Sequence, residues 1–269
     1  MSFTRLLSKE YNNVDRLVLS RIQLDAVQPS LMFHTHGKEG LLYGLVGKFN
    51  VYANGLYLGS YDSGISIENH RGNNIVVCRF PAHNEYDISI TMRSHAADLL
   101  WMTCEPLVPY ATTTTAHMSP IAPYMHVRDS VWHDVGHGTH QRSVCELPTP
   151  PGYEIATGET HNIIGGISSW PPHATPEDIE RFSNGETTWE EAMFYIGDGF
   201  ADLRGVYTGG SIVNKIMPIH NGEAHVMPLG SHAIYSKVDC NLKYVWFYCG
   251  SALKKFYNSF SDDLNVYKK

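Results

Sequence analysis

Two histidines and one glutamate, far apart in the chain, are the side chains whose types and spacing best fit a metal site. His173 ends the run Ser-Trp-Pro-Pro-His, Glu191 follows it after 18 residues, and His232 follows Glu191 after 41. Two neutral imidazoles and one carboxylate leave coordination positions open, as a catalytic metal ion requires. We expect three neighbouring strands of a small β-barrel to point these side chains inward at one ion.

The first half of the chain offers a second candidate metal set, His34, His36 and Glu39. Residues two apart on a strand face the same way, so the two imidazoles could share one face. A fourth ligand would be His83 or Glu85. Spacing alone leaves both sets open, because the chain has 15 histidines and any one of them can equally be a surface or hydrogen-bonded residue.

The elements that must position these residues are short β-strands. A chain with 23 glycines, 14 prolines, 16 tyrosines and 10 phenylalanines has the composition of turn-rich β structure. Asn54-Gly55 is a tight-turn signal, and a Pro-led acidic stretch at 175–182 predicts one or two helical turns. The expected strands lie at 17–27 (one strand or two), 41–52 (a pair interrupted by glycine), 65–68, 74–80, 86–91, 98–103, 191–195, 201–207, 225–227 and 243–248.

Short strands at this regular spacing indicate barrels or sandwiches, and an internal repeat suggests two of them. Glu39–Gly44 is similar to Glu191–Gly197, and Phe80-Pro81 follows the first segment much as Met227-Pro228 follows the second. The stretch 105–125 is rich in Pro and Thr. We therefore expect an N-terminal barrel at 1–110, a linker and inter-barrel segment at 111–150, and a C-terminal barrel with the metal site at 151–269.

Composition excludes several function classes. A net charge of −7 argues against a nucleic-acid or anionic-membrane surface, because both need clustered Lys and Arg. No apolar run approaches the roughly 20 residues of a membrane span, and we expect no export signal at the N-terminus. The five cysteines form no C-x-x-C pair and are interpreted as free thiols of a reducing compartment. We expect a cytoplasmic protein, which could form homo-oligomers through its edge strands.

Three segments of the second half resemble the sugar isomerase family of two-cupin proteins. That family includes 5-deoxy-glucuronate isomerase of inositol breakdown and 5-keto-4-deoxyuronate isomerase of pectin breakdown. The segments are Gly165–His173, Glu190–Tyr195 and Val226–His232. The inositol-breakdown branch is the more similar, because it has the same Ser-Ser-aromatic-Pro-Pro-His run and a similar insertion before the Glu-Glu pair. The likeness is specific in the second half and loose in the first.

The resemblance implies an all-β fold of two tandem cupin barrels, each a double-stranded β-helix or jelly roll, with few short helices. It also implies a divalent metal, zinc or manganese rather than iron, in the C-terminal barrel. By position, His173, Glu191 and His232 match three of the family's four ligands. The fourth, a histidine two residues after the first, is replaced by Thr175, which fits the N-cap of the expected short helix.

The activity that the resemblance implies is an aldose–ketose isomerisation, an intramolecular oxidoreduction of a deoxy-uronate such as 5-deoxy-glucuronate through an enediol. Glu190, Tyr195 and Tyr244 are the candidates for moving the proton. Arg142, in a segment that also looks like the family, is the candidate for holding the carboxylate of a small sugar acid in a forked pair. A structural salt bridge between the barrels is the alternative role of Arg142.

Two other functions stay open. The missing histidine could mark a barrel that binds a sugar acid without converting it, or one that is only structural. Two His and one Glu also suit the iron of a cupin dioxygenase, whose turnover would depend on oxygen.

Overall fold

The computed structural model describes residues 2–7, 16–64, 75–82, 84–105, 131–147, 149, 153–175, 190–208, 211–227 and 230–249. Over these ranges the chain is almost entirely β-strand, with one 3₁₀ turn, η4 (Gly138–His140). In the same ranges, no helix has the length and apolar character needed to cross a membrane. The chain divides into two compact units, one comprising Met1–Val131 with Leu147–Ala156 and the other Trp132–Glu146 with Thr157–Lys269.

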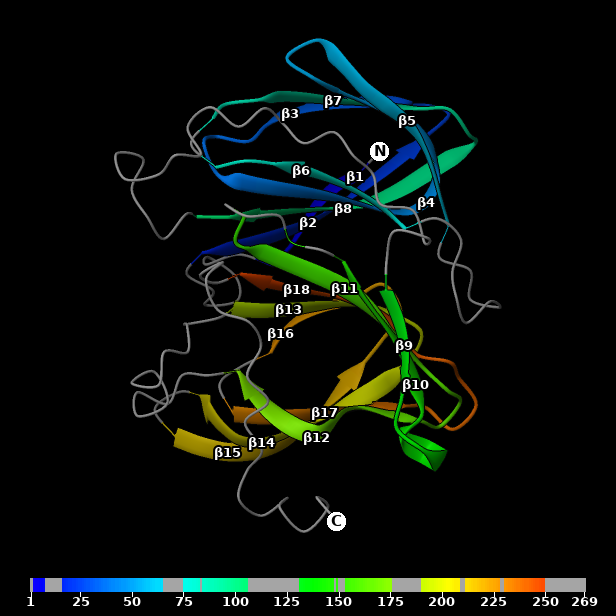
Figure 1. The fold of residues 1–269 in the computed structure, drawn as a ribbon, viewed down its shortest axis with the longest axis vertical. Helices are drawn as coiled ribbons and strands as arrows, with labels where there is room; N and C mark the ends of the chain where they lie inside the picture. Colours follow the sequence, from blue (N-terminus) through cyan, green and yellow to red (C-terminus); the bar gives the residue numbers. More distant parts are fainter. Residues whose placement is uncertain are drawn as a thin grey trace. The chain divides into compact units, whose positions relative to one another are not determined.

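The first unit is built around a single eight-stranded sheet that folds over on itself (Figure 1). Its order is β1-β2-β8-β4-β7-β3, and β5 and β6 also pair with β4. The strands are β1 (Ser2–Leu7), β2 (Leu17–Asp25), β3 (Ser30–His34), β4 (Glu39–Ala53), β5 (Leu56–Gly64), β6 (Val76–Phe80), β7 (Asp87–Met92) and β8 (Ala96–Cys104).

Strand β4 bends and so belongs to both layers of this unit. Residues 40–44 pair with β6 and β8, whereas residues 49–53 pair with β7 and β5. Gly47 lies between these parts with φ 106°, which side chains rarely adopt, and a Cβ there would come 2.4 Å from the Ala96 carbonyl oxygen. The strand pair expected over 41–52 is therefore one bent strand.

The turn predicted at Asn54-Gly55 is confirmed. Both residues have positive φ, 49° and 76°, as a two-residue hairpin turn of type I′ requires. The turn connects β4 to β5 and fixes their register.

Apolar side chains fill the interior of the first unit. Phe49, Phe80 and Trp101 belong to one cluster of buried residues that also contains Leu42. Gly40, two residues before Leu42, has no side chain because the Trp101 ring occupies that space: a Cβ on Gly40 would lie 2.2 Å from a ring carbon. This interior is a hydrophobic core.

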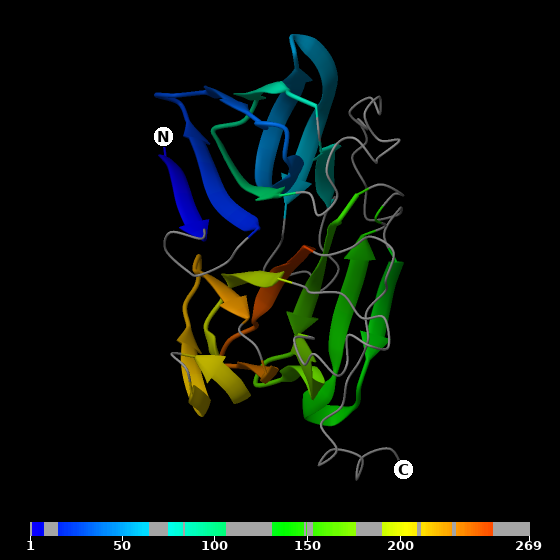
Figure 2. The same cartoon turned by 90° about the vertical axis from the view of Figure 1, so that its left-hand side faces the viewer.

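The second unit is built from two sheets that face each other (Figure 1). The six-stranded sheet has the order β16-β13-β18-β11-β10-β9, and the four-stranded sheet has the order β12-β17-β14-β15. Figure 2 shows β9 and β10 continuing the layer of β11. The strands are β9 (Val131–Val135), β10 (Arg142–Leu147), β11 (Ile155–Asn162), β12 (Ile167–Thr175), β13 (Glu190–Ile196), β14 (Gly199–Thr208), β15 (Ser211–Ile219), β16 (Ala224–Met227), β17 (Gly230–Ser236) and β18 (Lys243–Cys249).

The structure differs from the expectations for the linker and for two of the cysteines. The expected linker at 111–150 contains β9 and β10, which pair into the six-stranded sheet. The helix expected at 175–182 and the strand expected at 65–68 lie outside the described residues, except that Thr175 ends β12. Three of the five cysteines are free thiols, Cys78, Cys145 and Cys240. The expectation is wrong for Cys104 and Cys249, which are disulfide-bonded.

Candidate metal and substrate site

The pairing of β13 with β18 lines up six side chains on one face of the six-stranded sheet. Glu191 lies opposite Tyr248, and the next two pairs on that face join Met193 to Trp246 and Tyr195 to Tyr244. Residues opposite each other in an antiparallel pair point the same way, and residues two apart share a face. All six are buried. This face looks toward the four-stranded sheet, because Tyr244 contacts serines of β12.

Glu191 and His232 meet in the interior of the second unit, one from each sheet. Nε2 of His232 lies 3.9 Å from Oε1 of Glu191, and both side chains are at most 1% exposed. That separation is too long for a hydrogen bond, yet shorter than two zinc–ligand bonds of about 2.0–2.2 Å each. His232 comes from β17 and Glu191 from β13, so the expectation of three neighbouring strands is wrong: two sheets supply these residues.

The carboxyl of Glu191 has few polar contacts to stabilise a charge. Neither of its oxygens has a hydrogen bond of normal geometry among the described residues, although the Tyr248 hydroxyl is close enough to lower its pKa. Burial dominates and raises the pKa of Glu191 to about 8. The same burial, reinforced by Glu191, raises the pKa of Tyr248 well above its ordinary value. A buried carboxyl without a strong partner is a group that a cation would stabilise.

The backbone places the third predicted ligand beside the second. His173 of β12 pairs directly with His232 of β17, and Thr175 pairs with Gly230. The side chains of His173 and Thr175 lie outside the described part of the structure. The donor set of His232 and Glu191, with His173 paired to His232, fits the imidazole and carboxylate ligands that divalent metals take in proteins.

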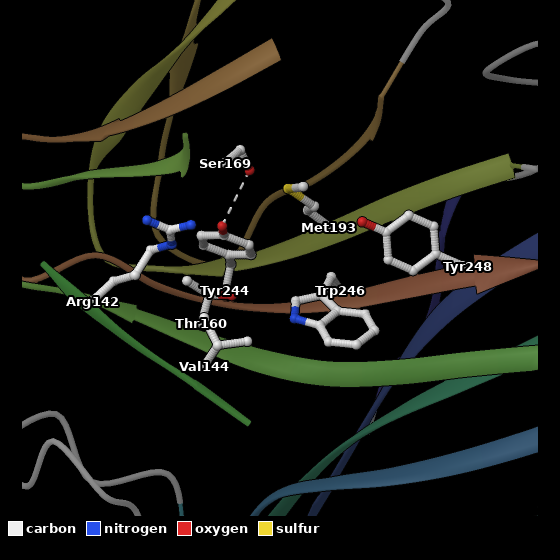
Figure 3. A pocket seen from close by; sticks show the side chains of 8 residues that line it. All are labelled: Arg142, Val144, Thr160, Ser169, Met193, Tyr244, Trp246 and Tyr248. Atoms are coloured by element: carbon white, nitrogen blue, oxygen red, sulfur yellow. Dashed lines mark hydrogen bonds between the residues drawn. The ribbon is translucent and has the colours of Figure 1, made fainter. Parts of the chain in front are cut away.

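A cavity of about 100 Å³ opens along the same interior face (Figure 3). Figure 3 shows Arg142 beside the ring of Tyr244 at one end, Trp246 and Tyr248 at the other, and Met193 between them. Val144, Thr160 and Ser169 complete the lining. Because Tyr248 lies opposite Glu191 on the sheet, the Tyr248 end of the cavity is the end next to the Glu191–His232 pair.

The other end of the cavity carries a positive charge and a group of hydroxyls. Nη1 of Arg142 donates to the His140 carbonyl at 3.2 Å, and burial lowers the pKa of Arg142 while Tyr244 raises it. The hydroxyl of Tyr244 donates to Oγ of Ser168 at 2.9 Å and contacts Oγ of Ser169 at 3.4 Å. Burial raises the pKa of Tyr244, and these hydroxyls and the Arg142 charge oppose that rise. An anionic group fits this end.

The three candidates for proton transfer are in different places. Tyr244 lines the cavity. Tyr195 is fully buried on the same face, but its hydroxyl contacts Sδ of Met193 at 3.6 Å and it does not line the cavity. Glu190 lies opposite Cys249, on the face of β13 turned away from Glu191. The structure therefore brings Tyr244 to the cavity, and neither Tyr195 nor Glu190.

The second candidate metal set is not brought together. His34 is 56% exposed, and its Nδ1 lies 2.6 Å from Oδ1 of Asp87. His36 is exposed with φ 53°, and the two imidazole rings are 5.6 Å apart. Glu39, by contrast, is buried. Exposed histidines and a buried glutamate do not surround one point.

Glu39 has structural partners instead. Its two oxygens accept hydrogen bonds from the backbone N–H groups of Glu154 and Ile155, at 2.6 and 2.9 Å. Burial raises the pKa of Glu39 to about 7, against the lowering effect of these amides and of Arg79. Burial also lowers the pKa of Arg79 to about 10, and its Nη1 donates to the Ile155 carbonyl at 2.6 Å. This group ties the segment 153–155 to the outer face of the first barrel.

Tyr248, Trp246 and Ser169 were not among the residues expected at the site. Tyr244, Trp246 and Tyr248 alternate along β18, a signal that predicts one shared face, but only the pairing with β13 identifies that face as the interior. Ser169 stands in the Ser-Ser-Trp-Pro-Pro-His run that carries the resemblance, but its place in the cavity lining depends on a local distortion of β12.

Comparison with solved structures supports the fold. An IolB-like protein from Salmonella typhimurium LT2 is similar with a TM-score of 0.75 at 17% identity, covering 98% of this chain and 95% of that one. The formate complex of oxalate decarboxylase from Lactobacillus farciminis has a TM-score of 0.64 at 13% identity, with coverage of 99% and 86%. Vicilin from Corylus avellana (hazelnut) has a TM-score of 0.58 at 10% identity, with coverage of 90% and 77%. The prediction of an all-β fold of two cupin barrels is confirmed.

Sequence comparison identifies the family. No curated protein matches the chain. The model of the KduI/IolB family matches residues 102–266, a stretch that contains every residue lining the cavity together with Glu191 and His232. Since this match spans more than half of the chain, the protein belongs to the KduI/IolB family of sugar isomerases.

Proposed function

We propose that this protein is a metal-dependent aldose–ketose isomerase acting on a deoxy-uronate such as 5-deoxy-glucuronate, as in inositol catabolism. The observation that carries the proposal is the meeting of Glu191 and His232 in the interior of the second barrel, next to a cavity whose far end holds Arg142. Family membership supports a sugar isomerase, and the cavity supports an acidic sugar.

Glu191, His232 and His173 would hold the divalent metal, zinc or manganese. When bound, such an ion polarises the carbonyl and hydroxyl oxygens of the substrate and stabilises the negative charge of the enediol. Tyr248 would orient the Glu191 carboxylate, because its hydroxyl is close enough to lower the Glu191 pKa. A tyrosine in this position has the role of the outer partners that fix metal ligands in other proteins.

Arg142 would bind the carboxylate of the substrate. Its guanidinium is partly buried at the cavity wall, where a charged pair is less screened by water. Met193 and Trp246 form an apolar wall between the Arg142 end and the Glu191 end. A sugar acid bound along this wall would have its carboxylate at Arg142 and its reacting carbons toward Glu191.

Tyr244, at the Arg142 end of the cavity (Figure 3), would donate a hydrogen bond to a substrate oxygen. Its raised pKa keeps the phenol protonated at neutral pH, so it can donate to a substrate oxygen. Without substrate, the Tyr244 hydroxyl donates its hydrogen bond to Oγ of Ser168 at 2.9 Å. A substrate oxygen would take the place of Ser168 as the acceptor. Of the three candidates from the sequence, Tyr244 is supported by its place in the cavity lining.

Metal analysis of Glu191→Ala tests the metal site, with Glu190→Ala as its matched control. The two glutamates are neighbours on β13 and face opposite ways. We expect the purified wild type and Glu190→Ala to contain about one metal ion per chain, and Glu191→Ala to contain far less. Equal metal in both variants would remove the assignment. Incubation with 5-deoxy-glucuronate and zinc or manganese, followed by detection of the ketose, tests the reaction.

A non-catalytic bicupin that binds a sugar acid, or is only structural, is the alternative, and Thr175 favours it. This residue stands two positions after His173, where the family has its second histidine ligand, and it ends β12. Stabilisation of the protein by 5-deoxy-glucuronate without any turnover would support the alternative. Turnover that depends on added metal would exclude it.

A further inference from the structure

Strand β12 is distorted at Ser169, beside the cavity. From Ser168 to His173 the chain advances five residues, whereas the partner strand advances only two, from Ile234 to His232, so β12 carries three extra residues. Ser169 begins this bulge with φ 51°, a left-handed conformation that residues other than glycine rarely adopt. Such a conformation persists only where the surroundings enforce it, and it is often found at functional sites.

The bulge turns two consecutive serines toward the same phenol. In a regular strand Ser168 and Ser169 would point to opposite faces. Here the Tyr244 hydroxyl donates to Oγ of Ser168 at 2.9 Å. It also contacts Oγ of Ser169 at 3.4 Å, as Figure 3 shows. Only Ser169 of the two lines the cavity, where Arg142 is also found.

Of the two serine hydroxyls, that of Ser169 could most easily exchange its present hydrogen bond for one to a ligand. Among the described residues its one hydrogen-bond partner is Tyr244, at a distance near the upper limit for such a bond. Ser168, in contrast, contacts both Tyr244 and the Ile234 carbonyl and is fully buried. A negatively charged oxygen in the cavity would offer Ser169 a stronger, charge-assisted bond than the phenol does.

We propose that Ser169 is a substrate-binding residue whose hydroxyl, placed by the bulge, binds the carboxylate that Arg142 holds. The proposal rests on the proposed function and deepens it, because it assigns the acidic end of the substrate to Arg142 and Ser169. The bulge thus gives the site a preference for a sugar acid over the neutral sugar.

Calorimetric titration with D-glucuronate and D-glucose tests this role in the full chain. Ser169→Gly removes the hydroxyl and suits the positive φ, so the fold should be kept. We expect Ser169→Gly to weaken D-glucuronate binding about tenfold and to leave D-glucose binding unchanged. Ser168→Ala is the matched control: it removes the other partner of Tyr244 but no group that lines the cavity, so the preference for D-glucuronate should persist.

Three results would overturn the proposal. They are a wild type without preference for D-glucuronate, a Ser169→Gly variant with unchanged preference, and an equal loss in Ser168→Ala, which would mean that the effect passes through Tyr244. Turnover of 5-deoxy-glucuronate is measured separately. A protein that binds D-glucuronate through Ser169 but converts no substrate would contradict the isomerase proposal and leave this inference standing.

Discussion

Replacing Glu191 by glutamine should stabilise the metal-free protein at neutral pH. Burial raises the pKa of this carboxyl from 4.5 to about 8. The folded state therefore keeps the proton to a higher pH than the unfolded chain does. Stability from this group is greatest below about pH 4.5, and it falls as the pH rises from about 4.5 to about 8. Glutamine cannot ionise, so the variant should escape this fall.

The size of the effect follows from the pKa difference. Each pKa unit corresponds to about 1.4 kcal/mol, so at pH 7 the wild type should be about 3 kcal/mol less stable than Glu191→Gln, and the two should converge near pH 4.5. Urea unfolding, followed by tryptophan fluorescence in metal-free buffers from pH 4.5 to 8, measures this difference. Glu190→Gln is the control and should keep the pH dependence of the wild type.

Adding zinc should reverse the order of the two proteins. Zinc at 100 times its dissociation constant stabilises a protein that holds it by about 2.7 kcal/mol. The wild type should gain this stability and Glu191→Gln should not, because the amide is a poor metal ligand. The reasoning is refuted if Glu191→Gln is the less stable protein at pH 7 without metal, or if zinc stabilises both proteins equally.

Two further predictions concern the first barrel. Glu39→Ala should lower the free energy of unfolding by about 3 kcal/mol, because two buried backbone amides lose their acceptors, and it should leave the metal content unchanged; urea unfolding and metal analysis check both points. Gly40→Ala should lower it by about 1–3 kcal/mol, because the new Cβ overlaps the Trp101 ring. Wild-type stability in Gly40→Ala would show that this core can rearrange.

The sequence predicted many of the strands, because their signals are local. Alternating or apolar runs bounded by turn residues occur at β6, β7, β8, β13, β14, β16 and β18, and each was expected within a few residues of its place. Strand β4 was expected as two pieces because glycine usually interrupts a strand. Gly47 bends the chain there but does not end the pairing, a difference that depends on neighbours distant in sequence.

The site was predictable only in part, because its geometry depends on which sheet each strand joins. The metal ligands were proposed from their types and spacing together with a resemblance, and the structure places Glu191 and His232 on facing sheets, with Nε2 of His232 3.9 Å from Oε1 of Glu191. The place of Tyr248 at the site could be recognised only from its position opposite Glu191 in the β13–β18 pair. The position of Ser169 depends on the distortion of β12. Pro171 and Pro172 are a local signal of an irregular strand, but they do not predict which side chains the distortion turns inward.

The internal repeat shows how one residue of register decides what each barrel contains. The internal repeat, as seen in the sequence, aligned Glu39 with Glu191. In the structure Gly40 lies opposite Phe80 on β6, and Glu191 lies opposite Met227 on β16; each of these partners is followed by proline. The structural counterpart of Glu191 is therefore Gly40.

A shift of one residue along a strand reverses every side chain, so Glu39 faces out of its barrel whereas Glu191 faces into its own. The tryptophans support this alignment, because Trp101 lies opposite Leu42 and Trp246 opposite Met193. With no side chain at Gly40, the Trp101 ring fills the first interior. With a carboxyl at the equivalent place, the second interior keeps a cavity beside Trp246, and Arg142 and Ser169 contribute to its lining. One position thus separates a barrel that is a hydrophobic core from a barrel for which we propose the binding of a cation and a sugar acid.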